Sequence, residues 1–283
     1  MEIDPFIRAG TTIFEDISAD AVLVEVDTIK DMEELQEFIS SKEINLFGVS
    51  SNEKIKKKFD NIIFVPDILK KITTRLEFAI SAALMQDLLK NEGKIVYIGK
   101  LDSEYYNFII TQKTNQINAK GIYELFFSLK NVKAEVIYSV LSIAVQLGRK
   151  GKEGKPIGTS FIIGDCGNVM QKSSQITYNP FERSYVTIND AGVQNMIKEF
   201  SRLDGAFIIS GDGKLLAASR YLEAGKDGLS LPKGLGARHL SAAWMTKVTD
   251  AVAIVLAESD NMIRIFKNGE LVWEVDPDEV KVD

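Results

Sequence analysis

The sequence contains a single cysteine, Cys166, and a single histidine, His239, in 283 residues. One cysteine excludes an intramolecular disulfide framework, which fits a reducing cytoplasm. Metal sites built from several cysteines or histidines, such as zinc sites, are excluded as well. We therefore expect any bound metal to be held mainly by oxygen atoms, which favours magnesium or manganese.

Long apolar runs and an excess of basic charge are also missing. The longest uninterrupted apolar run, residues 251–257, is far shorter than the roughly 20 residues that span a bilayer. The first residues lack the basic and apolar regions of a secretory signal. A net charge of -6 gives no support to a nucleic-acid surface. We expect a cytoplasmic protein with no membrane and no nucleic-acid partner.

The first part of the chain alternates between short apolar runs and charged, helix-compatible stretches. Strands are expected at residues 21–26, 44–49, 62–65, 94–99 and 108–111, and helices at residues 32–39 and 74–90. This alternation predicts a small α/β domain, residues 1–115, with a parallel or mixed sheet. It offers no histidine, cysteine or glycine-rich phosphate loop, so a regulatory or assembly role fits it better than catalysis. Residues 112–120 are polar and are predicted to form a linker.

The second part, residues 120–283, groups strands into blocks with helices around them. Helices are expected at residues 122–129, 136–147, 193–202 and 238–247, and strands at residues 159–163, 206–209, 214–218, 251–257, 262–266 and 271–275. Turns are expected at residues 148–156, 164–167, 211–213 and 268–269. This order indicates a mixed-sheet α+β or α/β domain, distinct from the first.

The triplet Asp204-Gly205-Ala206 opens one of these predicted strands. Gly205 would let a nucleotide approach the backbone, and Asp204 would bind a cation or activate a hydroxyl. The alternative is that Asp-Gly simply forms the turn that begins a strand.

A second candidate segment, residues 234–242, places glycines before a predicted helix. Exposed backbone N–H groups and the helix dipole favour an anion there. Arg238 can grip a phosphate with two N–H groups, and Ser241 can donate to an oxygen. A helix-capping loop with a hydrogen-bonded His239 is the alternative. Glu258, at the end of the 251–257 strand, is a third candidate, because sites collect at strand ends.

In combination, these motifs resemble the diadenylate cyclase (DAC) domain. The triplet at residues 204–206 is similar to the family's DGA motif, and residues 236–240 are similar to the segment that carries its RHR motif. Residues 148–165 look like the opening of the domain, and the resemblance runs from about residue 120 to residue 274. An α/β first domain looks like that of the archaeal members, which is similar to a pyruvate-kinase C-terminal domain.

The resemblance implies that two ATP molecules are joined into cyclic di-3′,5′-AMP (c-di-AMP), a second messenger, with release of two pyrophosphates. It implies catalytic roles for Asp204, Arg238 and His239, and a divalent metal, Mn²⁺ or Mg²⁺, held by Asp204 and Glu258. Leu222 would pack on the adenine. The implied ATP-binding residues are Gly205, Ala206, Leu222, Gly236, Ala237, Arg238, His239, Leu240 and Ser241.

The sequence departs from the family at Leu240, where the last arginine of RHR would stand. Arg238, the metal, backbone donors or another base such as Arg264 would then meet the phosphate charge. Two nucleotides must attack each other, so the simplest active unit is a homo-oligomer in which two protomers face across a two-fold axis. Leu240 also keeps open a non-catalytic sensor of ATP or c-di-AMP. An allosteric metabolic enzyme is a third hypothesis, but no catalytic residues support it.

Overall fold

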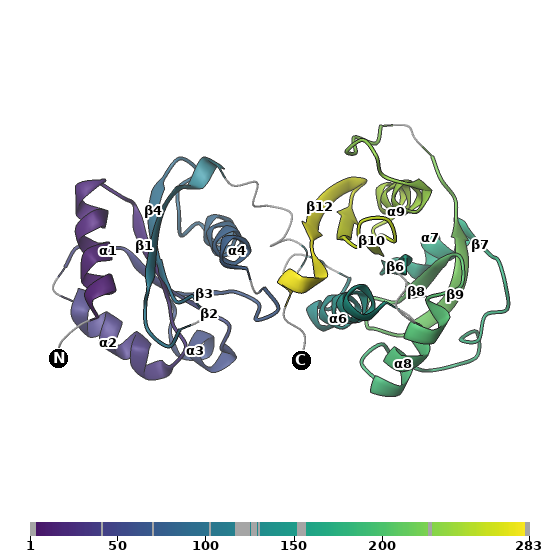
Figure 1. Cartoon of the computed structure of the whole chain (residues 1–283), viewed down its shortest axis with the longest axis horizontal. Helices are drawn as coiled ribbons and strands as arrows, with labels where there is room; N and C mark the ends of the chain where they lie inside the picture. Colours follow the sequence, from purple (N-terminus) through teal and green to yellow (C-terminus); the bar gives the residue numbers. More distant parts are fainter. Residues whose placement is uncertain are drawn as a thin grey trace. The chain divides into compact units, whose positions relative to one another are not determined.

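The computed structural model describes residues 4–40, 42–69, 71–101, 103–116, 125, 129, 131–151, 157–225 and 228–280. The chain divides into two units, unit 1 (Met1–Tyr123) and unit 2 (Glu124–Asp283), which Figure 1 draws in purple to blue and in teal to yellow. The predicted boundary at residues 116–119 lies mostly outside the described residues and stays a prediction. So does the likeness of the first domain to pyruvate kinase.

Unit 1 is built on a mixed sheet with the strand order β3-β2-β1-β4-β5. The strands are β1 (Ala21–Glu25), β2 (Leu46–Ser50), β3 (Ile62–Phe64), β4 (Lys94–Gly99) and β5 (Phe108–Lys113), and the helices are α1 (Pro5–Asp16), α2 (Ile29–Ile39), α3 (Glu53–Lys58) and α4 (Ile72–Met85). The strands β1 to β4 are parallel, and β5 is antiparallel to β4. Every residue of β1 and β2 is buried, as expected of a parallel sheet covered on both faces. The predicted mixed α/β sheet is confirmed.

Apolar side chains of α1, α2 and α3 form one core cluster against this sheet, and α4 lies on the opposite face (Figure 1). The helix α1 was not expected from the sequence, although Asp4 caps it and Pro5 stands at its first turn, a typical helix start. The predicted linker at residues 112–120 is wrong in its first part. Gln112 and Lys113 pair with β4, because a polar edge strand carries little apolar pattern. Residues 117–120 lie outside the described residues.

Unit 2 contains a second mixed sheet, with the strand order β12-β11-β10-β6-β8-β9-β7. Its strands are β6 (Thr159–Ile163), β7 (Ser173–Gln175), β8 (Ala206–Ile209), β9 (Leu215–Leu222), β10 (Val252–Leu256), β11 (Ile263–Lys267) and β12 (Glu270–Val275), and its helices are α6 (Ala134–Lys150), α7 (Cys166–Gln171), α8 (Ala191–Phe200) and α9 (Ala237–Val248). The pair β6–β8 is parallel, and the other pairs are antiparallel. The predicted mixed-sheet domain is confirmed.

Two predicted turns of unit 2 differ from the structure. The helix α6 continues through Lys150 and ends at Gly151, whose φ is 55°, so only part of residues 148–156 could be a turn, and residues 152–156 are not described. The predicted turn at residues 164–167 runs directly into α7, which begins at Cys166. Of the predicted helix at residues 122–129, the structure describes only residues 125 and 129.

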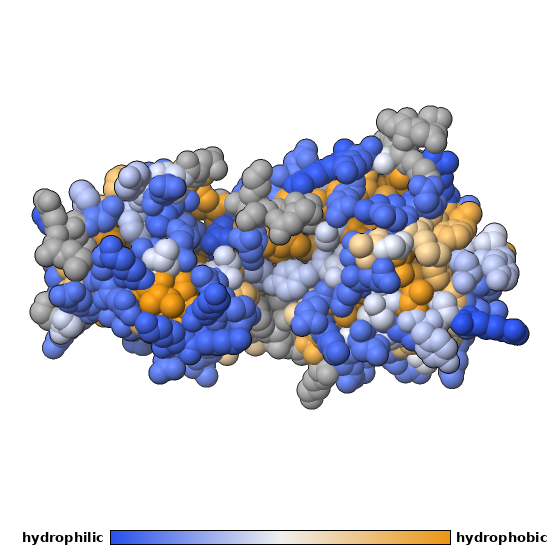
Figure 2. All heavy atoms as spheres, turned by 90° about the horizontal axis from the view of Figure 1, so that it is seen from below, coloured by the Kyte–Doolittle hydropathy of each residue, from blue (hydrophilic) through white to orange (hydrophobic). Residues whose placement is uncertain are grey.

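No helix in the described part of the chain is long and apolar enough to cross a bilayer. On the face that Figure 2 shows, hydrophilic side chains cover much of both units, and apolar patches are also exposed on each unit.

The topology brings several strand ends to one edge of the unit 2 sheet. Antiparallel pairing puts the ends of β9 and β10 beside the starts of β8 and β6. The helix α9 packs on the same region, with Ala242, Ala243 and Met245 in the core cluster under it. The N-terminus of α9 therefore lies over four neighbouring strand ends.

Candidate active site

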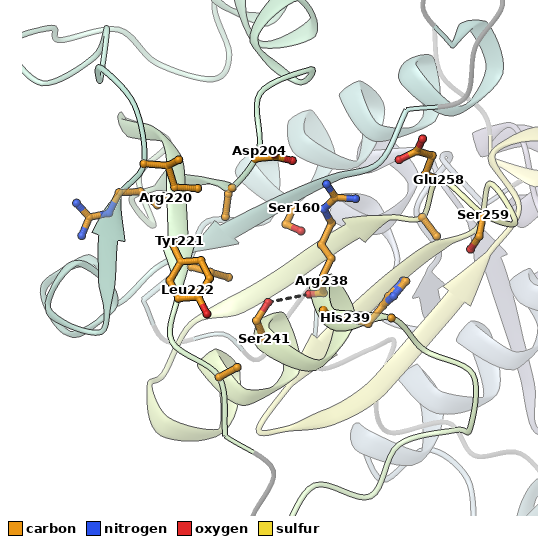
Figure 3. A pocket seen from close by; sticks show the side chains of 17 residues that line it. Ser160, Asp204, Arg220, Tyr221, Leu222, Arg238, His239, Ser241, Glu258 and Ser259 are labelled. Carbon is orange, nitrogen blue, oxygen red and sulfur yellow. Dashed lines mark hydrogen bonds between the residues drawn. The ribbon is translucent and has the colours of Figure 1, made fainter.

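A cavity of about 770 Å³ opens at this edge, between the strand ends and the start of α9 (Figure 3). Ten of the residues implied by the resemblance line it: Asp204, Gly205, Ala206, Leu222, Gly236, Ala237, Arg238, His239, Ser241 and Glu258. Leu240 is not among the lining residues, because each residue of an α-helix is turned by about 100° from the one before. The two motif segments, far apart in the sequence, thus meet at one cavity.

Asp204 is exposed at the start of β8, and its backbone is anchored. Its carbonyl oxygen accepts a hydrogen bond of 2.7 Å from the Ser219 hydroxyl on β9. The next residue, Gly205, has a φ of 101°. A Cβ there would lie 2.7 Å from the backbone nitrogen of Arg220. Close packing on β9 is therefore one reason for a glycine here, and the approach of a nucleotide to Gly205, which lines the cavity, stays a prediction.

Gly205→Ala is expected to lower the free energy of unfolding by about 1–3 kcal/mol or more, because the alanine must hold a left-handed φ and overlaps β9. Urea unfolding measures the change. Gly236→Ala is the matched control, since no atom lies within 4 Å of its added Cβ and its φ of -76° suits any residue. Equal destabilisation by the two variants would contradict this account of Gly205.

The N-terminus of α9 faces the cavity without a side-chain cap. Gly236 is its N-cap residue and forms no capping hydrogen bond through a side chain. The first N–H groups of the helix therefore point toward the cavity mouth, where the helix dipole favours an anion. Ser241 donates its hydroxyl proton to the Arg238 carbonyl at 3.1 Å (Figure 3), so its predicted donation to phosphate would require that bond to break.

Arg238 supplies a guanidinium that is not engaged with the protein. Within the described residues it forms no ion pair and no side-chain hydrogen bond, and Figure 3 shows it pointing into the cavity between Ser160 and Glu258. Gly158 makes room for it, since a Cβ at Gly158 would overlap Arg238 Nη1. A half-buried, unpaired guanidinium beside a helix N-terminus is a strong phosphate-binding arrangement.

Two other arginines near the cavity, Arg264 and Arg220, form hydrogen bonds and ion pairs with other protein groups. Arg264 is 7% exposed, donates to Asp260 at 2.6 and 3.1 Å and pairs with Glu274. These bonds from Arg264 lower the pKa of Asp260. Arg220 lines the cavity, but its guanidinium donates to the Met170 carbonyl at 2.7 Å and to the Ser173 hydroxyl. The suggestion that Arg264 replaces the missing family arginine is therefore wrong.

His239 lies in the wall of the cavity as a buried, neutral imidazole. It is 6% exposed, its Nε2 lies 3.5 Å from Arg264 Nη1, and its ring meets Phe266 edge-on at 6.1 Å. Its Nδ1 has no partner among the described residues. Burial, followed by the charge of Arg264, lowers the pKa of His239 to about 4. The side chain can donate or accept a hydrogen bond at neutral pH, but it does not add a positive charge.

This pKa predicts a specific loss of stability in weak acid. The folded histidine has a pKa of about 4, against 6.5 in an unfolded chain, so the unfolded state binds more protons between these values. The free energy of unfolding should therefore fall as the pH drops from 6.5 to about 4, and the decline from this group should end below that. Urea unfolding across this window measures it.

His239→Gln is the control for that measurement, because His239 is the one histidine of the chain. Asp165, Asp212 and Asp260 have lowered pKa values and titrate below the window. The slope of stability against pH should be smaller in the variant. Identical slopes in both proteins would show that His239 is not held neutral.

Asp204 and Glu258 offer the cavity two exposed carboxylates from different strand ends (Figure 3). The described residues contain no group of three or more His, Cys, Asp or Glu side chains that could hold a metal by themselves. Magnesium and manganese are often bound by one or two carboxylates together with substrate phosphates and water. The donor set therefore fits a metal that arrives with a phosphate ligand.

The sequence analysis missed several residues of the lining: Ser160, Ile176, Ala224 and Ala257. Ser160 carried a usable signal, since Thr159 and Ser160 put two hydroxyl groups at the start of the buried strand β6. Tyr221, next to Leu222, is 59% exposed at the cavity and was not assigned a role either.

Comparison with known proteins gives consistent matches. Residues 146–271 match the family model "DisA bacterial checkpoint controller nucleotide-binding" (DAC). A protein of Haloferax volcanii named diadenylate cyclase is 40% identical over 77% of this chain and 81% of its own. Another of that name, from Methanocaldococcus jannaschii, is 34% identical over 96% of each chain. A solved structure of DacA from Staphylococcus aureus is 20% identical and covers 51% of this chain and 89% of that one, with a TM-score of 0.38.

Proposed function

Because the chain belongs to the diadenylate cyclase family, we propose that it condenses two ATP molecules into c-di-AMP and releases two pyrophosphates. One observation carries this proposal. A single cavity gathers the exposed carboxylate of Asp204, the unpaired guanidinium of Arg238 and the uncapped start of α9. Its volume of about 770 Å³ falls in the usual range of small-molecule sites.

We propose that the nucleotide lies along the sheet edge. Leu222, 6% exposed, would pack on the adenine, and Tyr221 stands beside it at the mouth. The phosphates would lie at the N-terminus of α9, where Arg238 and backbone N–H groups neutralise negative charge. The position of these residues around the cavity supports this scheme.

Each half-reaction is an in-line displacement at phosphorus. The 3′-oxygen of one ATP forms a bond to the α-phosphorus of the other, and the bond from that phosphorus to the pyrophosphate breaks. The hydroxyl proton leaves, and Asp204 is the carboxylate placed to take it or to hold a metal beside the oxygen. Arg238 stabilises charge that develops on the phosphoryl group, and neutral His239 can contribute a hydrogen bond only.

We propose a divalent ion, Mn²⁺ or Mg²⁺, as the cofactor, with Asp204 and Glu258 as its protein ligands. When bound, such an ion neutralises charge on the pyrophosphate leaving group. Phosphate and water oxygens would complete the ligand set, since the described residues offer no third carboxylate in the same group.

The active unit in this proposal is a pair of facing protomers. Each chain contributes one set of these side chains, whereas ring closure requires two nucleotides that attack each other. Tyr221 and Ile176, 59% and 45% exposed, line the cavity and offer apolar surface for such a contact.

Specific activity is therefore expected to fall when the enzyme is diluted at saturating ATP, because the facing pair dissociates. Initial rates across a dilution series, with the mass of the particle measured in parallel, give the result. Strictly proportional activity from a demonstrated monomer would contradict the facing-protomer arrangement.

The proposal is tested by incubation of purified protein with ATP and manganese or magnesium, followed by chromatography with mass detection. We expect c-di-AMP and pyrophosphate, and neither when the metal is removed by a chelator. Bound but unchanged ATP with every metal would overturn the cyclase.

Bound but unchanged ATP would favour the alternative function, a non-catalytic sensor of ATP or c-di-AMP, which Leu240 supports in the sequence. Leu240 itself does not line the cavity.

A further inference from the structure

Ser160 is a buried hydroxyl that faces the cavity without a partner. The residue is 2% exposed, and its Oγ forms no hydrogen bond with any described residue. It nevertheless lines the cavity, and Figure 3 shows its oxygen between Asp204 and Arg238. A buried hydroxyl without a partner costs free energy, so this atom lacks a hydrogen bond that a bound molecule could supply.

The neighbouring strands cannot satisfy this hydroxyl. Ser160 is in register with Ala206 on β8 and with Val255 on β10, and residues paired in a sheet present their side chains to the same face. Neither side chain carries a polar atom. Other buried hydroxyls of unit 2 differ in this respect, for example Thr246, which donates to the Ala243 carbonyl and accepts from the Gly269 N–H.

The order of the strands locates Ser160 along the nucleotide. The cavity runs across β9, β8, β6 and β10 in that order. Leu222 lies on β9, Asp204 and Ala206 at the start of β8, Ser160 on β6, and Glu258 just after the end of β10. Adenine lies at the first of these strands in the proposed function, and the pyrophosphate end lies toward the last. In that arrangement Ser160 would lie below the segment between the sugar and the leaving group, which is the α-phosphoryl group.

We propose that the Ser160 hydroxyl donates a hydrogen bond to a non-bridging oxygen of the α-phosphoryl group of ATP. This inference rests on the proposed function. The Arg238 guanidinium lies beside this position (Figure 3) and attracts an anionic oxygen, which is the acceptor that gains most from a hydroxyl donor. The bond orients the phosphorus between the attacking and leaving oxygens and makes Ser160 a substrate-binding residue.

The test compares binding of adenosine, AMP and ATP to the unaltered protein and to Ser160→Ala by calorimetry. The variant should bind AMP and ATP about tenfold or more weakly, whereas adenosine, which has no phosphate, should bind equally well. The melting temperature of the free variant should be unchanged or higher, because the alanine removes an unpaired buried hydroxyl.

Thr246→Val is the matched control, since it removes a buried hydroxyl that has partners within the protein. It should lower the melting temperature and leave the affinities unchanged. Equal affinities in Ser160→Ala, a loss shared with adenosine, or a lower melting temperature of its free form would each overturn the assignment. If the unaltered protein binds ATP but makes no c-di-AMP, the proposed function fails while the comparison still tests Ser160.

Discussion

Asp204→Asn is expected to slow c-di-AMP formation strongly while ATP still binds. The rate should fall about 10²- to 10⁴-fold, the range for loss of a positioned acid or base, because the amide neither accepts the 3′-hydroxyl proton nor attracts a cation. The fold should persist, since the exposed side chain is replaced by one of the same shape and Ser219 holds the backbone of residue 204 through its carbonyl. Initial rates and ATP titration of the two proteins give the result.

Asp212→Asn is the matched control for that variant. Asp212 begins a second Asp-Gly pair of unit 2, in the turn between β8 and β9, where it accepts a hydrogen bond from Ser210. Turnover should be unaffected there, because Asp212 does not line the cavity. If the Asp204→Asn protein kept its activity, Asp204 would have no catalytic role, and the Asp-Gly pair at residues 204–205 would only form the turn before β8.

Arg238→Ala is expected to lower kcat/KM for ATP by about 10²- to 10³-fold, the effect typical of removing one preorganised donor. The loss should be large because Arg220 and Arg264 are held by other partners, so no arginine beside the cavity takes its place. Steady-state kinetics with ATP as the varied substrate measures the change. Unchanged kcat/KM would remove Arg238 from the phosphate site.

Two companion variants refine the Arg238 result. Gly158→Ala should cause a smaller loss of kcat/KM, since the added methyl displaces the flexible end of Arg238. A modestly lower melting temperature is also expected, because that methyl lies 3.2 Å from the backbone nitrogen of Glu258. Leu240→Arg should not restore activity to Arg238→Ala, because residue 240 does not line the cavity. Rescue by that arginine would place residue 240 in the site.

Much of the fold could be predicted because its signals are local. The apolar side chains Val136, Val140, Ile143 and Leu147 recur at helical spacing, and α6 buries all four. Strands such as β6 and β10 are short buried apolar runs. Elements with weak patterns were missed or cut short, as with the polar end of β5, whose place in the sheet comes from pairing with β4.

The candidate site could be assembled from motifs, but the state of its side chains could not. Nothing local in the sequence indicates that Arg264 forms ion pairs with Asp260 and Glu274, or that burial lowers the pKa of His239. Both depend on which side chains the sheet brings together. The register of β6 similarly leaves the hydroxyl of Ser160 beside two apolar neighbours.

The most direct test of the central claim is an isotope-mixing measurement. The protein is incubated with equal amounts of ordinary ATP and uniformly ¹³C-labelled ATP, and the molecular mass of the cyclic product is measured by mass spectrometry. We predict c-di-AMP of three masses, unlabelled, half-labelled and fully labelled, in the ratio of random pairing, and about 10²-fold less product or lower still from Asp204→Asn in the same time. A product without the half-labelled species, or ATP recovered unchanged, would contradict the account.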